Sequence, residues 1–153
     1  MRKQIAAAAI LATIIIVLAA GYYVFWISNV AGSNTARISF AGIVLTVDMA
    51  TTPAEQQQGL SGRPSLPADH GMLFVFQQAS EWGFWMPKMN FPLDIIWFDS
   101  NKRVVFIEQN LQPCTPTLCP VYTPPTPALY VLEVNAGFVK AHGVSVGNTF
   151  TFA

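Results

Sequence analysis

The pattern of hydrophobic and polar residues divides the chain into one long apolar segment and a longer region of short strands. Residues 5–27 form an unbroken run of 23 uncharged residues, rich in Ala, Ile, Leu and Val. From residue 38 onward, short apolar runs recur between turn residues, and several of them alternate with polar residues at the period of a half-buried strand. The pattern therefore predicts a membrane segment followed by a β-rich domain.

The predicted strands of this domain are short. Residues 38–49 form two alternating runs that break at Ala41-Gly42, which indicates a hairpin or a bulged strand. Residues 72–76 are too apolar for a half-exposed strand, so they predict a central one. Residues 93–99 and 103–108 flank a short polar turn and predict a hairpin. Further strands are predicted at residues 82–86, 130–134 and 148–152.

Two short helices complete the predicted domain. Thr52-Pro53-Ala54-Glu55 is a capping box with proline at the first helical position, and this helix should end between Gly59 and Gly62. A second helix is predicted to open at residues 135–137 and to close at Gly143. The predicted fold class is mainly β (α+β), a compact barrel-like antiparallel or mixed sheet with two short helices, preceded by one transmembrane helix.

The apolar segment has the length and the flanking charges of a membrane anchor. As a helix it would be about 35 Å long, enough to cross a hydrocarbon core of about 30 Å. Arg2 and Lys3 precede it, and the next cation is Arg37, so the positive-inside rule places the N-terminus in the cytoplasm. The predicted parts are a cytoplasmic N-terminus (1–4), a transmembrane helix or uncleaved signal anchor (5–27), a linker (28–36) and an extracytoplasmic domain (37–153).

A cleaved signal peptide is the alternative reading of this segment. Ala19-Ala20-Gly21 and Val30-Ala31-Gly32 are candidate cleavage sites of the small-x-small type. Cleavage would make the domain a secreted protein, and retention would make it a single-pass protein of the cell membrane. Both readings export the domain.

The distribution of charged residues argues against nucleic acid as a partner. Charged residues make up only 10% of the chain, and from residue 34 onward six Lys or Arg stand against eight Asp or Glu, a net charge of −2. Binding to nucleic acid needs a basic stripe that neutralises phosphates, and no such cluster occurs. We therefore expect no nucleic-acid partner.

The two cysteines lie in a proline-rich segment, residues 112–127. Cys114 and Cys119 form a Cys-x4-Cys pattern, and in an exported domain such a pair is expected to be a disulfide. Redox or metal chemistry is the alternative, but catalytic dithiols usually have two residues between the cysteines and structural zinc needs four ligands. We expect no metal and no cofactor.

Two carboxylates lie in apolar surroundings. Asp94 stands in Phe-Pro-Leu-Asp-Ile-Ile and Glu133 in Val-Leu-Glu-Val-Asn, and a buried carboxylate needs a partner. Arg63 is the expected partner of Asp94. The two acids could instead perform acid–base chemistry, as in glycoside hydrolysis. The structural alternative is that each is a buried ion pair or a backbone acceptor that organises loops.

Residues 84–91 are dense in aromatic and methionine side chains. Alternation places Trp85 on the opposite side from Phe84 and Met86, so at least one set of side chains could be exposed. An exposed aromatic face could stack on a sugar ring or hold an apolar peptide. A core role for Trp85 is the alternative.

Several short motifs follow one another along the domain. They are Thr52-Pro-Ala-Glu-Gln-Gln-Gln-Gly-Leu60, Gly71-Met-Leu-Phe-Val-Phe76, Phe84-Trp-Met86, Pro92-Leu-Asp-Ile95, Asn110 with Pro113-Cys114, Cys119-Pro-Val-Tyr122 and Tyr130-Val-Leu-Glu-Val-Asn-Ala-Gly137. In these motifs and in their order, the chain resembles the family called "domain of unknown function 192" over residues 36–153. The resemblance implies a small exported or membrane-anchored domain, mainly β, and it implies no particular reaction.

The resemblance also implies a shared surface that includes both cysteines. The chain departs from the family pattern at Pro87-Lys88, where many members carry Lys-Asn, and at Ser61-Gly62, where many carry a bulky residue and an aromatic one. The predicted ligand surface consists of Arg63, Trp85, Met86, Lys88, Asp94, Tyr122, Glu133 and Asn135.

Three functions are compatible with these features. The preferred one is a non-catalytic binding module of the cell envelope for a small polar, glycan or peptide ligand. The second is an interaction partner of another membrane protein, which predicts a contiguous apolar patch and no pocket. The third is an envelope hydrolase, which predicts that Asp94 and Glu133 face each other across a cleft, roughly 5–10 Å apart.

Overall fold

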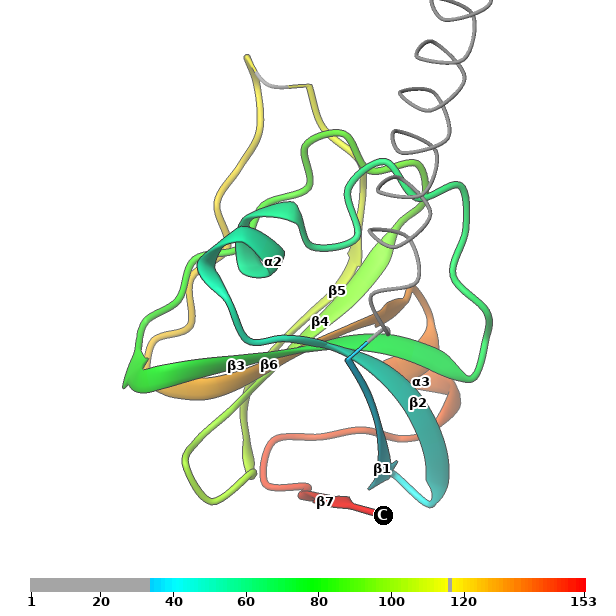
Figure 1. The fold of residues 1–153 in the computed structure, drawn as a ribbon, viewed down its shortest axis with the longest axis vertical. Helices are drawn as coiled ribbons and strands as arrows, with labels where there is room; N and C mark the ends of the chain where they lie inside the picture. The colour runs from blue at the N-terminus through cyan, green and yellow to red at the C-terminus, as the bar shows by residue number, and fades with distance from the viewer. Residues whose placement is uncertain (1–33, 116) are drawn as a thin grey trace, which may run out of the picture. The chain divides into compact units, whose positions relative to one another are not determined.

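The computed structural model describes residues 34–115 and 117–153, which form a curled, mixed sheet of seven strands with two short helices (Figure 1). The strand order is β5-β4-β6-β3-β2-β1-β7, and only the β2–β3 pair is parallel. This confirms a mainly β fold with two short helices. The elements are β1 (Thr35–Phe40), β2 (Ile43–Ala50), α2 (Pro53–Gln58), β3 (His70–Ser80), β4 (Leu93–Phe98), β5 (Val104–Leu111), β6 (Ala128–Asn135), α3 (Phe138–Ala141) and β7 (Phe150–Phe152).

Local chemistry explains the first half of the domain. Ala41 and Gly42 both have positive φ, 52° and 80°, as a two-residue hairpin turn requires, so residues 38–49 are a hairpin. The parallel β2–β3 pair needs a crossover, and α2 lies within it. The predicted capping box starts α2, since Thr52 Oγ1 accepts from the Glu55 N–H and Glu55 Oε2 accepts from the Thr52 N–H.

Residues 82–86 were predicted to be a strand, and this prediction is wrong. The segment makes only isolated bridges, Phe84 with Tyr122 and Pro87 with Cys114. Its aromatic alternation has another cause, because Trp82 stacks on Phe76 of β3 with ring centroids 4.1 Å apart. The segment therefore packs on the sheet without joining its ladder of strands.

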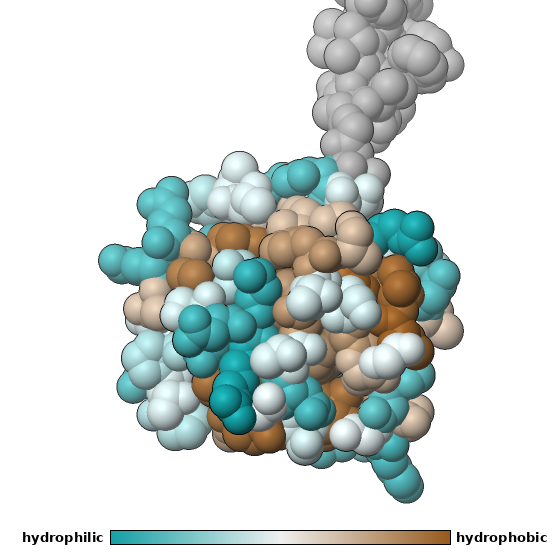
Figure 2. All heavy atoms as spheres, turned by 90° about the horizontal axis from the view of Figure 1, so that it is seen from below, coloured by the Kyte–Doolittle hydropathy of each residue, from teal (hydrophilic) through white to brown (hydrophobic). Residues whose placement is uncertain are grey.

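The predicted cytoplasmic N-terminus, the predicted membrane segment 5–27 and most of the predicted linker lie outside the described residues. Within residues 34–115 and 117–153, no helix combines the length and the apolar character that crossing a bilayer requires. The face that carries β7 and the ends of the β1–β2 and β4–β5 hairpins mixes hydrophilic and hydrophobic residues (Figure 2). Val44 on β2 and Phe152 on β7 are large apolar side chains that are exposed.

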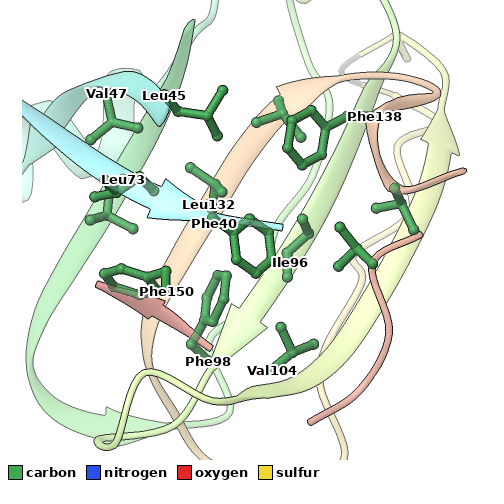
Figure 3. Packing of buried hydrophobic residues seen from close by; sticks show 14 residues of the cluster. Phe40, Leu45, Val47, Leu73, Ile96, Phe98, Val104, Leu132, Phe138 and Phe150 are labelled. Carbon is green, nitrogen blue, oxygen red and sulfur yellow. The ribbon is translucent and has the colours of Figure 1, made fainter. Parts of the chain in front are cut away.

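Both faces of the sheet are covered, which explains why all six residues of β4 are buried. One face holds a cluster in which Phe40 packs against Phe98, and Phe98 against Phe150, edge to face (Figure 3). The other face holds a second cluster around Phe74 and Trp97, to which the 82–91 segment contributes. This second face carries the candidate site.

Candidate functional site

A cavity of about 600 Å³ lies on the second face of the sheet. It is bounded by α2 with the loop that follows, by the aromatic segment after β3, and by side chains of β3 and β6. The volume falls in the range of small-molecule sites, roughly 300–1,000 Å³. Its lining residues are Ala54, Gln56, Gln57, Gln58, Gly59, Leu60, Ser61, Gly62, Phe74, Phe76, Trp82, Gly83, Phe84, Trp85, Pro87, Lys88, Met89 and Glu133.

Aromatic rings form much of the wall. Phe84 lies edge to face against Phe74, with ring centroids 4.8 Å apart, and Phe76 stacks on Trp82. These contacts hold the rings in fixed orientations. Trp85 also lines the cavity and is 54% exposed. The predicted alternation is confirmed, because Phe84 and Met86 are buried while Trp85 faces solvent.

Glu133 is the buried acid of the cavity. It lies on β6, paired with Met72 of β3 and Ile95 of β4, and is only 5% exposed. Among the residues that the structure describes, no group donates a hydrogen bond to its Oε2. Burial raises the pKa of Glu133 to about 8, while the Arg63 charge and a hydrogen bond from the Leu60 backbone oppose the rise. The carboxyl is therefore largely protonated at neutral pH.

Arg63 carries the positive charge near Glu133. Its Nη1 lies 2.6 Å from Oδ2 of Asp48, so the two form an ion pair. Asp48 pairs in register with Met72, which in turn pairs with Glu133, so both acids belong to one row across the sheet. The prediction that Arg63 pairs with Asp94 is wrong.

Gly59 brings the end of α2 directly against Glu133. It caps the helix at φ 51°, a conformation that favours glycine. A Cβ at this position would lie 3.7 Å from Oε2 of Glu133 and 3.5 Å from Cζ of Phe74. The missing side chain therefore leaves the acid and the aromatic ring side by side at the cavity wall.

Asp94 lies on the opposite face of the sheet. Ile95 pairs with Glu133 and shares its face, so the neighbouring Asp94 points the other way. Its carboxylate accepts backbone N–H groups of Asn110 (2.8 Å) and Val139 (2.9 Å) and is fully buried. The hydrolase hypothesis, which needed both acids in one cleft, is wrong, and the structural alternative holds for Asp94.

The remaining predicted surface residues have supporting positions. Met86 is a core residue with 1% of its surface exposed. Tyr122 exchanges two backbone hydrogen bonds with Phe84, of 2.8 and 2.9 Å. Asn135 donates to the Leu66 carbonyl oxygen at 2.9 Å. Of the predicted ligand surface, only Trp85, Lys88 and Glu133 line the cavity, and Arg63 acts on it through its charge.

Cys114 and Cys119 form the predicted disulfide. The Cys114 N–H donates to the Met86 carbonyl oxygen at 3.1 Å, so the closed loop is tied to the aromatic segment. Within residues 34–115 and 117–153, no three His, Cys, Asp or Glu side chains cluster in a way that could hold a metal ion.

The sequence interpretation missed the contributions of α2 and β3 to the cavity. Phe74 and Phe76 resemble ordinary core residues in the sequence, and nothing local shows that they border an open space. The run Gln56-Gln57-Gln58 was the available signal for a polar contact between this helix and the sheet. A helix that buries no side chain needs such a contact to stay in place. Gln56 supplies one by donating to the Val75 carbonyl oxygen at 2.9 Å.

Comparison with known proteins agrees with the motifs. The family model DUF192, described as "Uncharacterized ACR, COG1430", matches residues 36–152. A crystal structure described as a "putative transcription regulator" from Sinorhizobium meliloti 1021 is 34% identical, with a TM-score of 0.70, over 77% of this chain and 92% of that one.

A protein of unknown function from Novosphingobium aromaticivorans DSM 12444 is 30% identical, with a TM-score of 0.73, over 80% of this chain and 88% of that one. No curated protein matches. The family model covers most of the chain, and the motifs it shares lie in the described domain. The chain therefore belongs to the DUF192 family.

Proposed function

We propose that this protein is a non-catalytic binding module of the cell envelope that holds a small polar, glycan or peptide ligand in the cavity beside α2. The observation that carries the proposal is the pairing of Glu133, buried with an unused acceptor oxygen within the described domain, and an aromatic wall in one cavity. Apolar pockets with a few polar groups are the usual form of small-ligand sites.

The lining suits a ligand with both a flat apolar face and polar groups. Trp85 offers an exposed ring on which a sugar ring or a side chain can stack. Gln57 and Ser61 add hydrogen-bonding groups at the same cavity. The interaction-partner alternative predicted an apolar patch without a pocket, so the cavity favours the binding module.

The name of the Sinorhizobium meliloti structure refers to transcription, and we do not extend that activity to this chain. From residue 34 onward acidic residues outnumber basic ones by eight to six. Phosphate backbones are held by clustered Lys and Arg, which this region lacks. We propose instead a location outside the cytoplasmic membrane, on a single N-terminal span, or free after cleavage.

A ligand screen on the detergent-solubilised full-length chain tests the binding module. We expect a glycan, peptide or small envelope fragment to raise the melting temperature and to change tryptophan fluorescence. Trp85→Ala should abolish this response by removing the exposed ring. Leu118→Ala is the matched control, because Leu118 is 81% exposed and does not line the cavity. An equal response in both variants, or no response to any class of compound, would contradict the proposal.

A further inference from the structure

We propose that the ligand carries an organic ammonium group, which lies between the aromatic rings and the carboxylate of Glu133. The inference rests on the proposed binding function and names the chemistry of its ligand. It is carried by the charges around the cavity, by the free acceptor and by the aromatic wall.

Within the described part of the chain, no cation lies close enough to Glu133 to form an ion pair with its ionised carboxyl. The Arg63 charge lowers the pKa of Glu133, but its guanidinium is already paired with Asp48 at 2.6 Å. Lys88 lines the cavity with an exposed side chain, and Glu55 is half-buried and engaged in the capping box. A cationic ligand would supply the missing charge inside the cavity, where attraction is stronger than in water.

Oε2 of Glu133 and the aromatic rings of the cavity both favour an ammonium group. Oε2 of Glu133 has no donor within the described part of the chain, and a buried acceptor without a partner destabilises the folded protein. An ammonium N–H satisfies it with a charge-assisted hydrogen bond. The faces of aromatic rings attract cations, and the exposed ring of Trp85 lines the same cavity as Glu133. A neutral hydroxyl satisfies the acceptor but gains neither the charge nor the cation–π term.

Binding of an ammonium ion should remove the proton that Glu133 carries in the free protein, and this makes the affinity depend on pH. The free protein holds Glu133 mostly protonated below pH 8, so binding an ammonium ion releases that proton to solvent while the ligand keeps its own. An alkyl ammonium like that of lysine, with a pKa of about 10.4, stays charged throughout this range. Affinity should therefore rise about tenfold per pH unit up to pH 8 and level off above it.

The test compares two probes of nearly equal shape on the solubilised full-length chain, 2-phenylethylammonium and 2-phenylethanol, by calorimetry at pH 6, 7 and 9. We expect the ammonium ion to bind more tightly at pH 9 than at pH 6 by roughly a hundredfold, the ratio of the ionised fractions of an acid of pKa 8. The alcohol should show no such dependence. Proton release, seen as a buffer-dependent heat, should accompany only the ammonium ion.

Glu133→Gln removes the titration while keeping the shape of the protonated acid. In this variant the ammonium ion should bind with a pH-independent affinity close to that of the parent protein at pH 6. Equal affinity for both probes, no binding of the ammonium ion, or an unchanged pH dependence in the variant would overturn the inference. The glycan and peptide screen decides the binding function separately, since a neutral ligand that depends on Trp85 would sustain it. If the variant fails to fold, the two probes on the parent protein still decide.

Discussion

At the scale of single residues, the burial of Glu133 makes the stability of the folded protein depend on pH. Its carboxyl titrates near 4.5 in the unfolded chain and at about 8 in the folded one. Between these values the folded protein binds more protons, so the free energy of unfolding falls as pH rises from about 5 to 8. The loss is complete above pH 8, where the acid is ionised in both states.

Glu133→Gln should remove this loss. The variant should be more stable than the parent protein at pH 9, by up to about 5 kcal/mol, and nearly equal to it at pH 4. Urea unfolding followed by tryptophan fluorescence at pH 4, 7 and 9 measures the difference. A parallel pH dependence of both proteins would show that Glu133 does not titrate in this range.

Glu55→Gln is the matched control, because the same change at Glu55 has the opposite sign. Hydrogen bonds from the backbone N–H groups of Thr52 and Thr51 lower the pKa of Glu55 in the folded protein. Its stabilisation is therefore present at neutral pH and disappears as pH falls through that lowered pKa. The control variant should be less stable than the parent protein at pH 7 and should match it in acid.

At the scale of elements, α2 depends on its cap and not on a buried face. It has six residues, none of them buried, and helices of this length do not form alone. Thr52→Ala should lower the free energy of unfolding by about 1 kcal/mol, and Thr52→Ser should restore most of it. Denaturant unfolding of the three proteins measures this. Equal stability of all three would show that Gln56 alone holds the helix on the sheet.

Short-range chemistry also explains which elements could be predicted. The capping box and the Ala41-Gly42 turn are set by neighbouring residues. The capping box was predicted correctly, and the hairpin at Ala41-Gly42 was one of the two predicted forms. The strand prediction for residues 82–86 failed because aromatic side chains that pack alternately on a sheet produce the same sequence pattern as a strand. The donors to Asp94, Asn110 and Val139, lie 16 and 45 residues away, so sequence could show that this acid needed partners but not which ones.

At the scale of the whole domain, the strand order was beyond prediction for the same reason. β6 lies between β3 and β4, although the chain reaches it last of the three. The cavity depends on this order, because Glu133 of β6 meets Phe74 of β3 under the end of α2. The sequence could single out Glu133 and Trp85, but only the tertiary arrangement shows that they share a cavity and that Asp94 does not.

The disulfide makes export testable on the whole molecule. Cys114 and Cys119 are bonded, and such bonds persist in oxidising compartments but not in the cytosol. We expect the full-length chain, expressed in a bacterium, to carry the disulfide and to be degraded by protease added to spheroplasts.

A chain without residues 1–27 is the matched control for this experiment. It should remain inside the cell with both thiols reduced, as alkylation followed by mass spectrometry would show. Reduced thiols or protection from protease in the full-length chain would refute export.

The mass of the recovered full-length protein also decides between the two forms of export, because an anchor keeps residues 5–27 while a cleaved signal peptide loses them. An anchored domain would stay near the membrane, because only residues 28–34 separate the predicted span from β1.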